Sequence, residues 1–159
     1  MAQVATIEQP LIQVVTMGER GQRGIAGPPG SAAQPQISAE NTDSVAVFRG
    51  QPLHMQPNGS VVRGNAVTSG RVVGFVSDPV IPPTTFGLVQ TDGQLDATLA
   101  EWQVVTGSAG GLSPGARYFL STTPGMLTLT PDLMNIVAFV GRAASPTTMI
   151  IDIDPPVFP

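Results

Sequence analysis

The sequence predicts an all-β fold: an N-terminal extended arm with a short collagen-like segment, followed by a compact β-sandwich or β-barrel body, with three chains forming a trimer. Gly and Pro are abundant, at 18 and 16 of 159 residues, whereas only 11% of residues are charged and Lys is absent. Exposed helix faces normally carry Lys and Glu, so this composition favours strands and turns. Glycine also recurs every third residue near the N-terminus, and short β-prone runs fill the remainder.

Residues 1–17 form the predicted anchoring arm. They contain an apolar, β-prone stretch from position 11 to position 17. A lone strand exposes an unpaired edge, so we expect it to pair with another chain or to dock onto a larger body. The candidate anchoring residues are Leu11, Ile12, Val14 and Val15.

Residues 18–30 follow a Gly-X-Y period. Only Gly fits at the axis where three polyproline-II chains meet, and adjacent prolines pre-set the extended backbone. Four triplets would span about 35–40 Å at roughly 3.1 Å per residue, too short to persist without trimeric flanking parts. The alternative is a periodic, turn-rich linker within a single chain. The candidate trimerisation residues are Gly18, Gly21, Gly24, Gly27, Pro28, Pro29 and Gly30.

Residues 31–43 are small and polar, which predicts a linker, and residues 44–159 form the predicted β-rich body. Its β-prone runs, separated by Gly, Pro, Asn and Asp, suit a sandwich or barrel. Helix-period segments with caps are not expected, beyond single turns in 94–101 and 131–135. The predicted strands are 45–48, 60–63, 71–76, 86–91, 102–106, 117–121, 126–130, 136–140 and 149–153.

Two hairpins are expected within the body. One joins 117–121 to 126–130 through Pro124-Gly125, because Pro followed by Gly supplies a tight turn. The other joins 86–91 to the run leading to Trp102 through Asp92-Gly93, a favoured dipeptide for hairpin turns. The Pro-rich residues 155–159 cannot continue a central strand, so they are expected at a surface.

Composition excludes several classes of function. The absence of Cys removes disulfide scaffolds, thiolate metal sites and cysteine nucleophiles. A net charge of −4 with scattered Arg argues against a nucleic-acid surface. The N-terminus lacks the pattern of a secretory signal, and no apolar run is long enough for a membrane span. We therefore expect a soluble protein with neither nucleic acid nor membrane as a partner.

Residues that carry chemistry are few. His54 has no carboxylate within ten residues, so a structural role is favoured over catalysis or metal binding. Asp152 and Asp154 share one strand face, an arrangement that holds Ca²⁺ if more oxygen ligands converge but is otherwise a solvated face. The Gly-rich stretch 107–111 is neither a nucleophile elbow nor a phosphate loop. Trp102 is expected in a core or a subunit interface. The sequence predicts no enzyme and no cofactor.

A resemblance rests on residues 111–121 (Gly-Leu-Ser-Pro-Gly-Ala-Arg-Tyr-Phe-Leu-Ser), 124–128 (Pro-Gly-Met-Leu-Thr), 140–143 (Val-Gly-Arg-Ala) and 147–153 (Thr-Thr-Met-Ile-Ile-Asp-Ile), with the apolar strand and triplets of 14–30 before them. These segments resemble the β-rich C-terminal domains of small structural proteins of tailed bacteriophages. Those proteins include capsid decoration (cement) proteins, head fibres and tail-fibre domains. Residues 44–109 resemble no family beyond their β-prone texture.

The resemblance implies a homotrimeric virion component that assembles in the host cytoplasm. The favoured function is that of a non-enzymatic capsid decoration trimer on the capsid surface. Its partners would be its own copies and the major capsid protein. The arm would anchor by adding strands to capsid-protein edges or by crossing between capsomers, with the body facing solvent. The alternative is a tail-fibre or receptor-binding component with a host-surface ligand.

Overall fold

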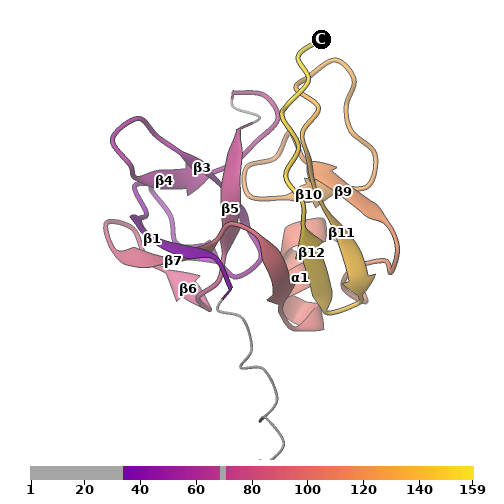
Figure 1. The fold of residues 1–159 in the computed structure, drawn as a ribbon, viewed down its shortest axis with the longest axis horizontal. Helices are drawn as coiled ribbons and strands as arrows, with labels where there is room; N and C mark the ends of the chain where they lie inside the picture. The colour runs from indigo at the N-terminus through magenta and orange to yellow at the C-terminus, as the bar shows by residue number, and fades with distance from the viewer. Residues whose placement is uncertain (1–33, 69–70) are drawn as a thin grey trace, which may run out of the picture. The chain divides into compact units, whose positions relative to one another are not determined.

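The computed structural model describes residues 34–68 and 71–159 and shows a protein that is mostly β (Figure 1). The described strands form three antiparallel sheets, accompanied by one short helix, α1 (Leu99–Thr106). The predicted all-β character of the body is therefore confirmed. Within these two ranges, no helix is long and apolar enough to cross a membrane.

The first sheet lies in the N-terminal half of the body and has five antiparallel strands. Their order is β1 (Gln36–Glu40), β7 (Phe86–Gln90), β5 (Val72–Val76), β3 (Pro52–Met55) and β4 (Val61–Arg63). Alternate residues of β7 are exposed and buried, as expected where one face of a strand packs on a core.

This sheet curls until its two edges meet. The amide of Thr42, just beyond β1, donates to the carbonyl oxygen of Val61 at the other edge (3.0 Å), beside an isolated parallel bridge between Asn41 and Val61. A two-stranded ribbon of β2 (Val47–Phe48) and β6 (Val80–Ile81) adds to the same core. The buried side chains of this first core are Ala39, Val47, Leu53, Val61, Val76, Ile81 and Val89.

The second sheet occupies the C-terminal half. Its order is β10 (Leu127–Thr128), β9 (Arg117–Leu120), β11 (Phe139–Ser145), β12 (Thr148–Ile151) and β8 (Gly93–Asp96). Helix α1 contributes Trp102 and Val105 to a larger core between itself and this sheet. Both side chains are fully buried.

The two halves are joined through strand β5 and through contacts between their loops, among them the hydrogen bond from the amide of Ala66 to the carbonyl oxygen of Ser121 (2.9 Å). Phe75 of β5 belongs to the second core, whereas its neighbour Val76 belongs to the first. Gly50, in the N-terminal half, lies against the ring of Trp102, and a Cβ at this position would approach Cζ3 of that ring to 2.9 Å. Its positive φ of 84° also favours glycine. The described body is thus one packed unit with two cores.

One predicted strand is wrong. Residues 102–106 belong to helix α1, not to a strand. The helix begins with a capping box, in which the Thr98 side chain accepts from the amide of Glu101 while the Glu101 side chain accepts from the amide of Thr98. It ends at Gly107, which has φ 69°, in the left-handed conformation common after helices.

The predicted linker also needs correction, because β1 occupies residues 36–40 and the buried Asn41 follows it. Small polar residues were compatible with a strand here because one face of β1 is exposed and Ala39 is buried on the other. The structured body therefore starts before residue 44.

The two predicted hairpins have different outcomes. Strands β9 and β10 pair antiparallel, with Leu120 opposite Leu127, so the Pro124-Gly125 hairpin is confirmed. The Asp92-Gly93 hairpin is wrong, since β7 pairs with β1 and β5 while β8 pairs with β12. Gly93 does adopt a positive φ of 84°, but the turn passes the chain from one sheet to the other.

Candidate interaction surface

The residues predicted to trimerise and to anchor lie outside the described residues. They are Gly18, Gly21, Gly24, Gly27, Pro28, Pro29 and Gly30, and Leu11, Ile12, Val14 and Val15. An interaction surface can therefore be sought only on the β body. Its described residues include one buried polar network and several exposed apolar side chains, among them Phe48 and Val80 on the β2–β6 ribbon and the two groups described below.

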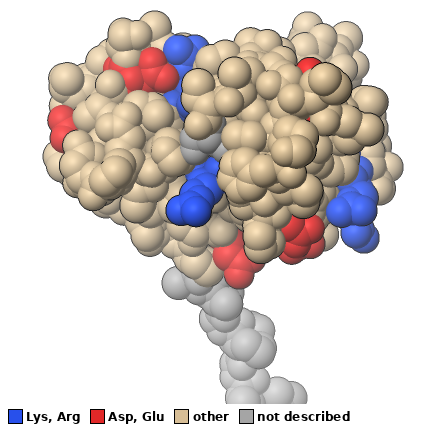
Figure 2. Space-filling view, turned by 90° about the horizontal axis from the view of Figure 1, so that it is seen from above, with Lys and Arg blue, Asp and Glu red and all other residues tan. Residues whose placement is uncertain are grey.

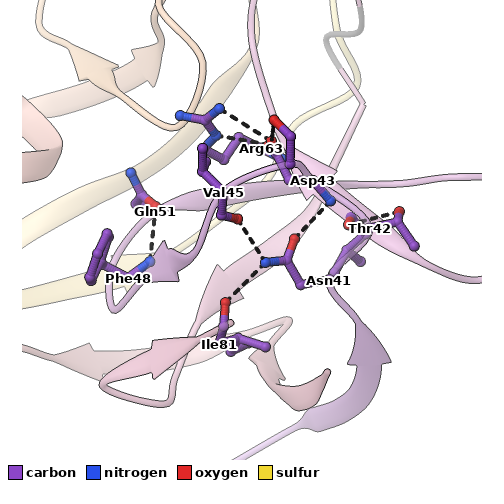
Figure 3. A network of polar contacts seen from close by, with 10 residues as sticks. Asn41, Thr42, Asp43, Val45, Phe48, Gln51, Arg63 and Ile81 are labelled. Atoms are coloured by element: carbon purple, nitrogen blue, oxygen red, sulfur yellow. Dashed lines mark hydrogen bonds and ion pairs between the residues drawn. The ribbon is translucent and has the colours of Figure 1, made fainter. Parts of the chain in front are cut away.

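The polar network is centred on Asn41, which is fully buried just after β1 (Figure 3). Its Nδ2 donates to the carbonyl oxygens of Val45 (3.0 Å) and Ile81 (2.9 Å), and its Oδ1 accepts from the amide of Asp43 (3.0 Å). Both polar atoms of the side chain are thus satisfied, as buried amides require. The network is a structural clamp rather than a reactive centre.

Arg63 and Asp43 form an ion pair beside this clamp. Nε of Arg63 donates to Oδ2 of Asp43 (2.8 Å), and Nη2 donates to Oδ1 (3.3 Å). Partial burial acts to raise the pKa of Asp43, but the hydrogen bonds from Arg63 and its positive charge outweigh burial and lower the pKa below its ordinary value. The pair ties the segment after β1 to strand β4.

The same clamp fixes the loop between β6 and β7. The amide of Thr84 donates to the carbonyl oxygen of Asn41 (2.7 Å). The amide of Asn41 donates in turn to the carbonyl oxygen of Thr85 (2.9 Å). Thr84 has φ 56°, a conformation that is unusual for a β-branched residue and costs about 1–3 kcal/mol. Two prolines precede it, so this loop is held rigidly in a strained conformation.

The loop leads directly into an exposed apolar surface. Phe86 and Leu88 are 71% and 41% exposed and lie on the same outward face of β7. Across the ladder they are paired with Glu40 and Ser38 of β1. We call these four residues the β7 face.

The β7 face is one end of a longer sheet face, and the C-terminal half of the chain covers the other end. Leu88, Gln90 and Phe75 point to the same side of the sheet, because Gln90 lies two residues after Leu88 and opposite Phe75 in the ladder. Gln90 and Phe75 are buried, and Phe75 packs in the second core. One end of the surface is therefore covered by the C-terminal half, while the end with Phe86 remains open.

A second apolar group lies near the C-terminal segment. Leu133 and Met134 are 74% and 86% exposed at the tip of a turn in which Asp132 accepts from the amide of Met134 (3.0 Å). Val157 and Phe158 are also exposed, and Val157 forms an antiparallel bridge with Val137, close to this turn in sequence. Residues 155–159 thus lie at the surface.

The residues considered for chemistry do not converge. Nδ1 of His54, in β3, is 2.8 Å from the carbonyl oxygen of Arg71, while Asp152 and Asp154 are exposed beyond β12. In the described ranges, no group of three His, Cys, Asp or Glu residues could hold a metal ion. Gly107 ends the helix, and Trp102 packs in the second core with its Nε1 donating to the carbonyl oxygen of Thr147 (2.9 Å).

Charge is sparse and mixed on the surface. Figure 2 shows basic and acidic side chains scattered over a face that is otherwise uncharged. The ion pairs among the described residues join Arg49 to Glu101 and Arg63 to Asp43, and the guanidinium of Arg117 lies 4.3 Å from the centroid of the Phe139 ring. Because charges of both signs are scattered, the surface of the described body has no strong positive or negative electrostatic patch, and a partner would bind it mainly through apolar contacts.

No protein-family model matches the chain, and no curated protein matches its sequence. The segments that carry the resemblance to phage structural proteins, residues 111–121, 124–128, 140–143 and 147–153, fall on strands β9 to β12 and the turns beside them. They supply buried side chains of the second core, such as Tyr118, Leu120 and Met149. These motifs therefore contribute to the packing of the second core.

The β7 face was not foreseen from the sequence. Phe86 lies in the predicted strand 86–91, but the sequence does not show which face of that strand is exposed. The available signal was the alternation in Phe86-Gly87-Leu88-Val89, which follows two prolines and two threonines. Asn41 falls in the predicted linker 31–43, where a buried side chain is not expected.

Proposed function

We propose that the chain is a non-catalytic structural protein of a tailed-bacteriophage particle, a trimer that decorates the capsid. Residues 1–17 anchor it to the major capsid protein, and the β body faces solvent. The observation that carries the proposal is the in-phase glycines of residues 18–30, placed immediately before a compact β body.

The glycine period supports three chains rather than one. A glycine at every third position is needed where three extended chains share an axis, because any larger side chain would clash there. Gly30 and the first residue of β1, Gln36, are six positions apart. Six residues reach at most about 22 Å, at roughly 3.3–3.6 Å each. The three bodies would thus be tethered close to the end of the triple helix.

The arm supports attachment to another protein. Its β-prone apolar stretch has the composition of a segment that adds a strand to an exposed sheet edge. Three such arms on one trimer act together, because binding of the first raises the effective concentration of the other two. Individually weak anchors would then hold the trimer firmly on a shell made of repeated subunits.

The deciding measurement is the copy number in purified particles, by quantitative mass spectrometry against the major capsid protein. A decoration protein is expected at dozens to hundreds of copies. A count of only a few copies, in multiples of three, would indicate a tail location and favour a fibre or receptor-binding role. Complete absence from particles would overturn both structural roles.

The triplets are tested by comparing Gly24→Val with Gln22→Val. Position 24 faces the axis of a triple helix and position 22 does not, so only the first variant should disrupt the segment. Native mass and protease sensitivity around residues 18–30 are the readouts. Identical behaviour of Gly24→Val and the parent chain would mean that the triplets are a plain linker.

The arm is tested by deleting residues 1–17. The truncated chain is expected to keep its folded body, checked by circular dichroism, and to lose attachment to particles in a co-sedimentation assay. Full attachment of the truncated chain would show that the anchor lies elsewhere.

A further inference from the structure

We infer that the β7 face is the surface through which the bodies of neighbouring copies contact one another. This inference rests on the proposed trimer and deepens it by naming the contact on the body. It concerns Phe86 and Leu88 on β7, with Ser38 and Glu40 beside them on β1.

The position of this face relative to the glycine triplets is the first argument. Each chain enters its body through β1, and Ser38 is opposite Leu88 in the adjacent strand. Ser38 is eight positions after Gly30, where three chains would still share an axis. The C-terminal end, by contrast, lies far from the start of β1 in Figure 1. The apolar group next to the C-terminal segment is thus the more remote of the two.

The composition of the face is the second argument. Phe86 is an aromatic side chain left 71% exposed, and large aromatic side chains are typical anchors of protein interfaces. Leu88 adds apolar area beside it, while the cross-strand residues Ser38 and Glu40 are polar, and Glu40 is the one charged residue of the four. The other end of the same surface, at Phe75, is already buried by the C-terminal half. A neighbouring copy would continue that burial onto Leu88 and Phe86.

The rigidity of the face is the third argument. Asn41 holds the chain on both sides of the β6–β7 loop, through its side chain to Ile81 and its backbone to Thr84 and Thr85. Strained backbone persists only where the surroundings enforce it, and such positions cluster at functional surfaces. A preformed surface also loses little conformational entropy when it binds. Phe86 is therefore presented in a fixed position for its partner.

This contact would hold the three chains of the short triple helix in register. Four triplets cannot hold three chains in register alone, so a flanking trimeric contact is needed. A body–body contact next to β1 supplies it eight to ten residues after Gly30, at Ser38 and Glu40.

The first experiment is site-specific cross-linking of the full chain. The chain has no Cys, so a single introduced thiol gives an unambiguous product. Ser38→Cys keeps both apolar side chains of the face, and Met134→Cys, at another exposed but remote site, is the matched control. With a short bis-maleimide at low protein concentration, we expect covalently linked chains for Ser38→Cys and little product for Met134→Cys. Equal cross-linking of the two variants, or none for Ser38→Cys, would overturn the inference.

The second experiment removes the anchor. Phe86→Ser is compared with Met134→Ser, which removes similar apolar area from a more exposed position. We expect the trimer of Phe86→Ser to dissociate at a protein concentration about tenfold higher or more, while Met134→Ser behaves like the parent chain. Circular dichroism and Trp fluorescence establish that each variant is folded.

The outcomes separate this inference from the proposed function. A parent chain that is monomeric by analytical ultracentrifugation would remove the trimer and the inference together. A parent chain that is trimeric, with Phe86→Ser equally trimeric, would overturn the inference alone. A trimeric Phe86→Ser that no longer binds particles would assign the β7 face to the capsid contact instead, which also overturns it.

Discussion

The two halves of the described body bury polar side chains to different extents. Four of the buried polar residues, Asn41, Gln51, Ser60 and Gln90, lie before residue 91, whereas Thr148 lies in the second sheet. The buried side chains of the first core are all aliphatic, while the second core also contains the aromatic side chains of Trp102 and Tyr118. The N-terminal half therefore relies more on hydrogen bonds to fix its loops, and the C-terminal half more on apolar packing.

This difference has a consequence for where an interaction surface can form. Buried amide side chains specify one backbone arrangement, because any other leaves polar atoms unpaired. The loop before Phe86 is held in this way by Asn41. Apolar packing supplies stability without such directional control. The polar half thus positions a surface, while the apolar half stabilises the body.

The largest expected effect is at the centre of the apolar half. Trp102→Ala should lower the free energy of unfolding by about 3–5 kcal/mol, as for large-to-small changes in other cores. Trp102 is fully buried and also supports Gly50 across the junction of the halves. Urea unfolding followed by circular dichroism measures the change.

Trp102→Phe is the matched control for that prediction. It keeps an aromatic ring but loses the hydrogen bond from Nε1 to the carbonyl oxygen of Thr147. Its loss should be clearly smaller than that of Trp102→Ala. Equal losses would mean that the hydrogen bond, not packing, dominates here, which would erase the contrast between the halves.

The second effect tests the polar half. Asn41→Ala leaves the carbonyl oxygens of Val45 and Ile81 and the amide of Asp43 without their partner. Unsatisfied buried groups make this substitution cost about 2–4 kcal/mol. In hydrogen exchange, the amides of residues 81–86 should lose more protection than those of the second sheet.

Asn41→Asp sharpens the interpretation. It has almost the volume of Asn but, when ionised, cannot donate to the two carbonyl oxygens. A comparable loss of stability at neutral pH is expected. If Asn41→Asp were as stable as the parent chain, filling of space rather than hydrogen bonding would explain the role of Asn41.

Strand positions could be predicted from the sequence where alternation and turn residues coincide. The β9–β10 hairpin follows from the Pro124-Gly125 turn, and β5 and β7 follow from runs rich in Val and Phe. Strand β1 could not, because Gln36-Ile37-Ser38-Ala39-Glu40 is polar and small and is held by pairing with β7. Pairing with β7 makes this segment a strand, and such tertiary pairing cannot be inferred from the local β-propensity of its residues.

The helix could have been predicted. Thr98 and Glu101 have the spacing of a capping box, and Gly107 follows the last helical residue. The β-branched Val104, Val105 and Thr106 suggested a strand instead, and the two caps outweighed their preference. The β7 face could not be predicted, because its exposure depends on which sheet face the second half covers.

A smaller effect follows from the helix cap. Thr98→Ala removes the side-chain oxygen that accepts from the amide of Glu101 (3.2 Å). The expected cost is about 1 kcal/mol, typical of a lost N-cap. Thr98→Ser keeps the hydroxyl and should restore most of the stability in the same urea titration. A Thr98→Ser variant no better than Thr98→Ala would show that the methyl group of Thr98, not its hydroxyl, is what matters.

The smallest effect is the pH dependence of the Asp43–Arg63 pair. Ion pairs near a surface contribute only about 0.2–1 kcal/mol. Because folding lowers the pKa of Asp43, the folded state holds its proton less tightly than the unfolded chain. The contribution is therefore complete above the unfolded pKa of about 3.9, and it is lost as the pH falls through the folded pKa.

Asp43→Asn tests this sign. The variant should be less stable than the parent chain at neutral pH, and the difference should shrink as the pH falls below about 4, near the ordinary pKa of Asp. Arg63→Gln removes the guanidinium that lowers the pKa of Asp43 and should reduce the same acid dependence. A difference between Asp43→Asn and the parent chain that stays constant from neutral to acid pH would mean that the carboxylate charge contributes nothing. The pair would then act only by shape, as the side chains of the apolar half do.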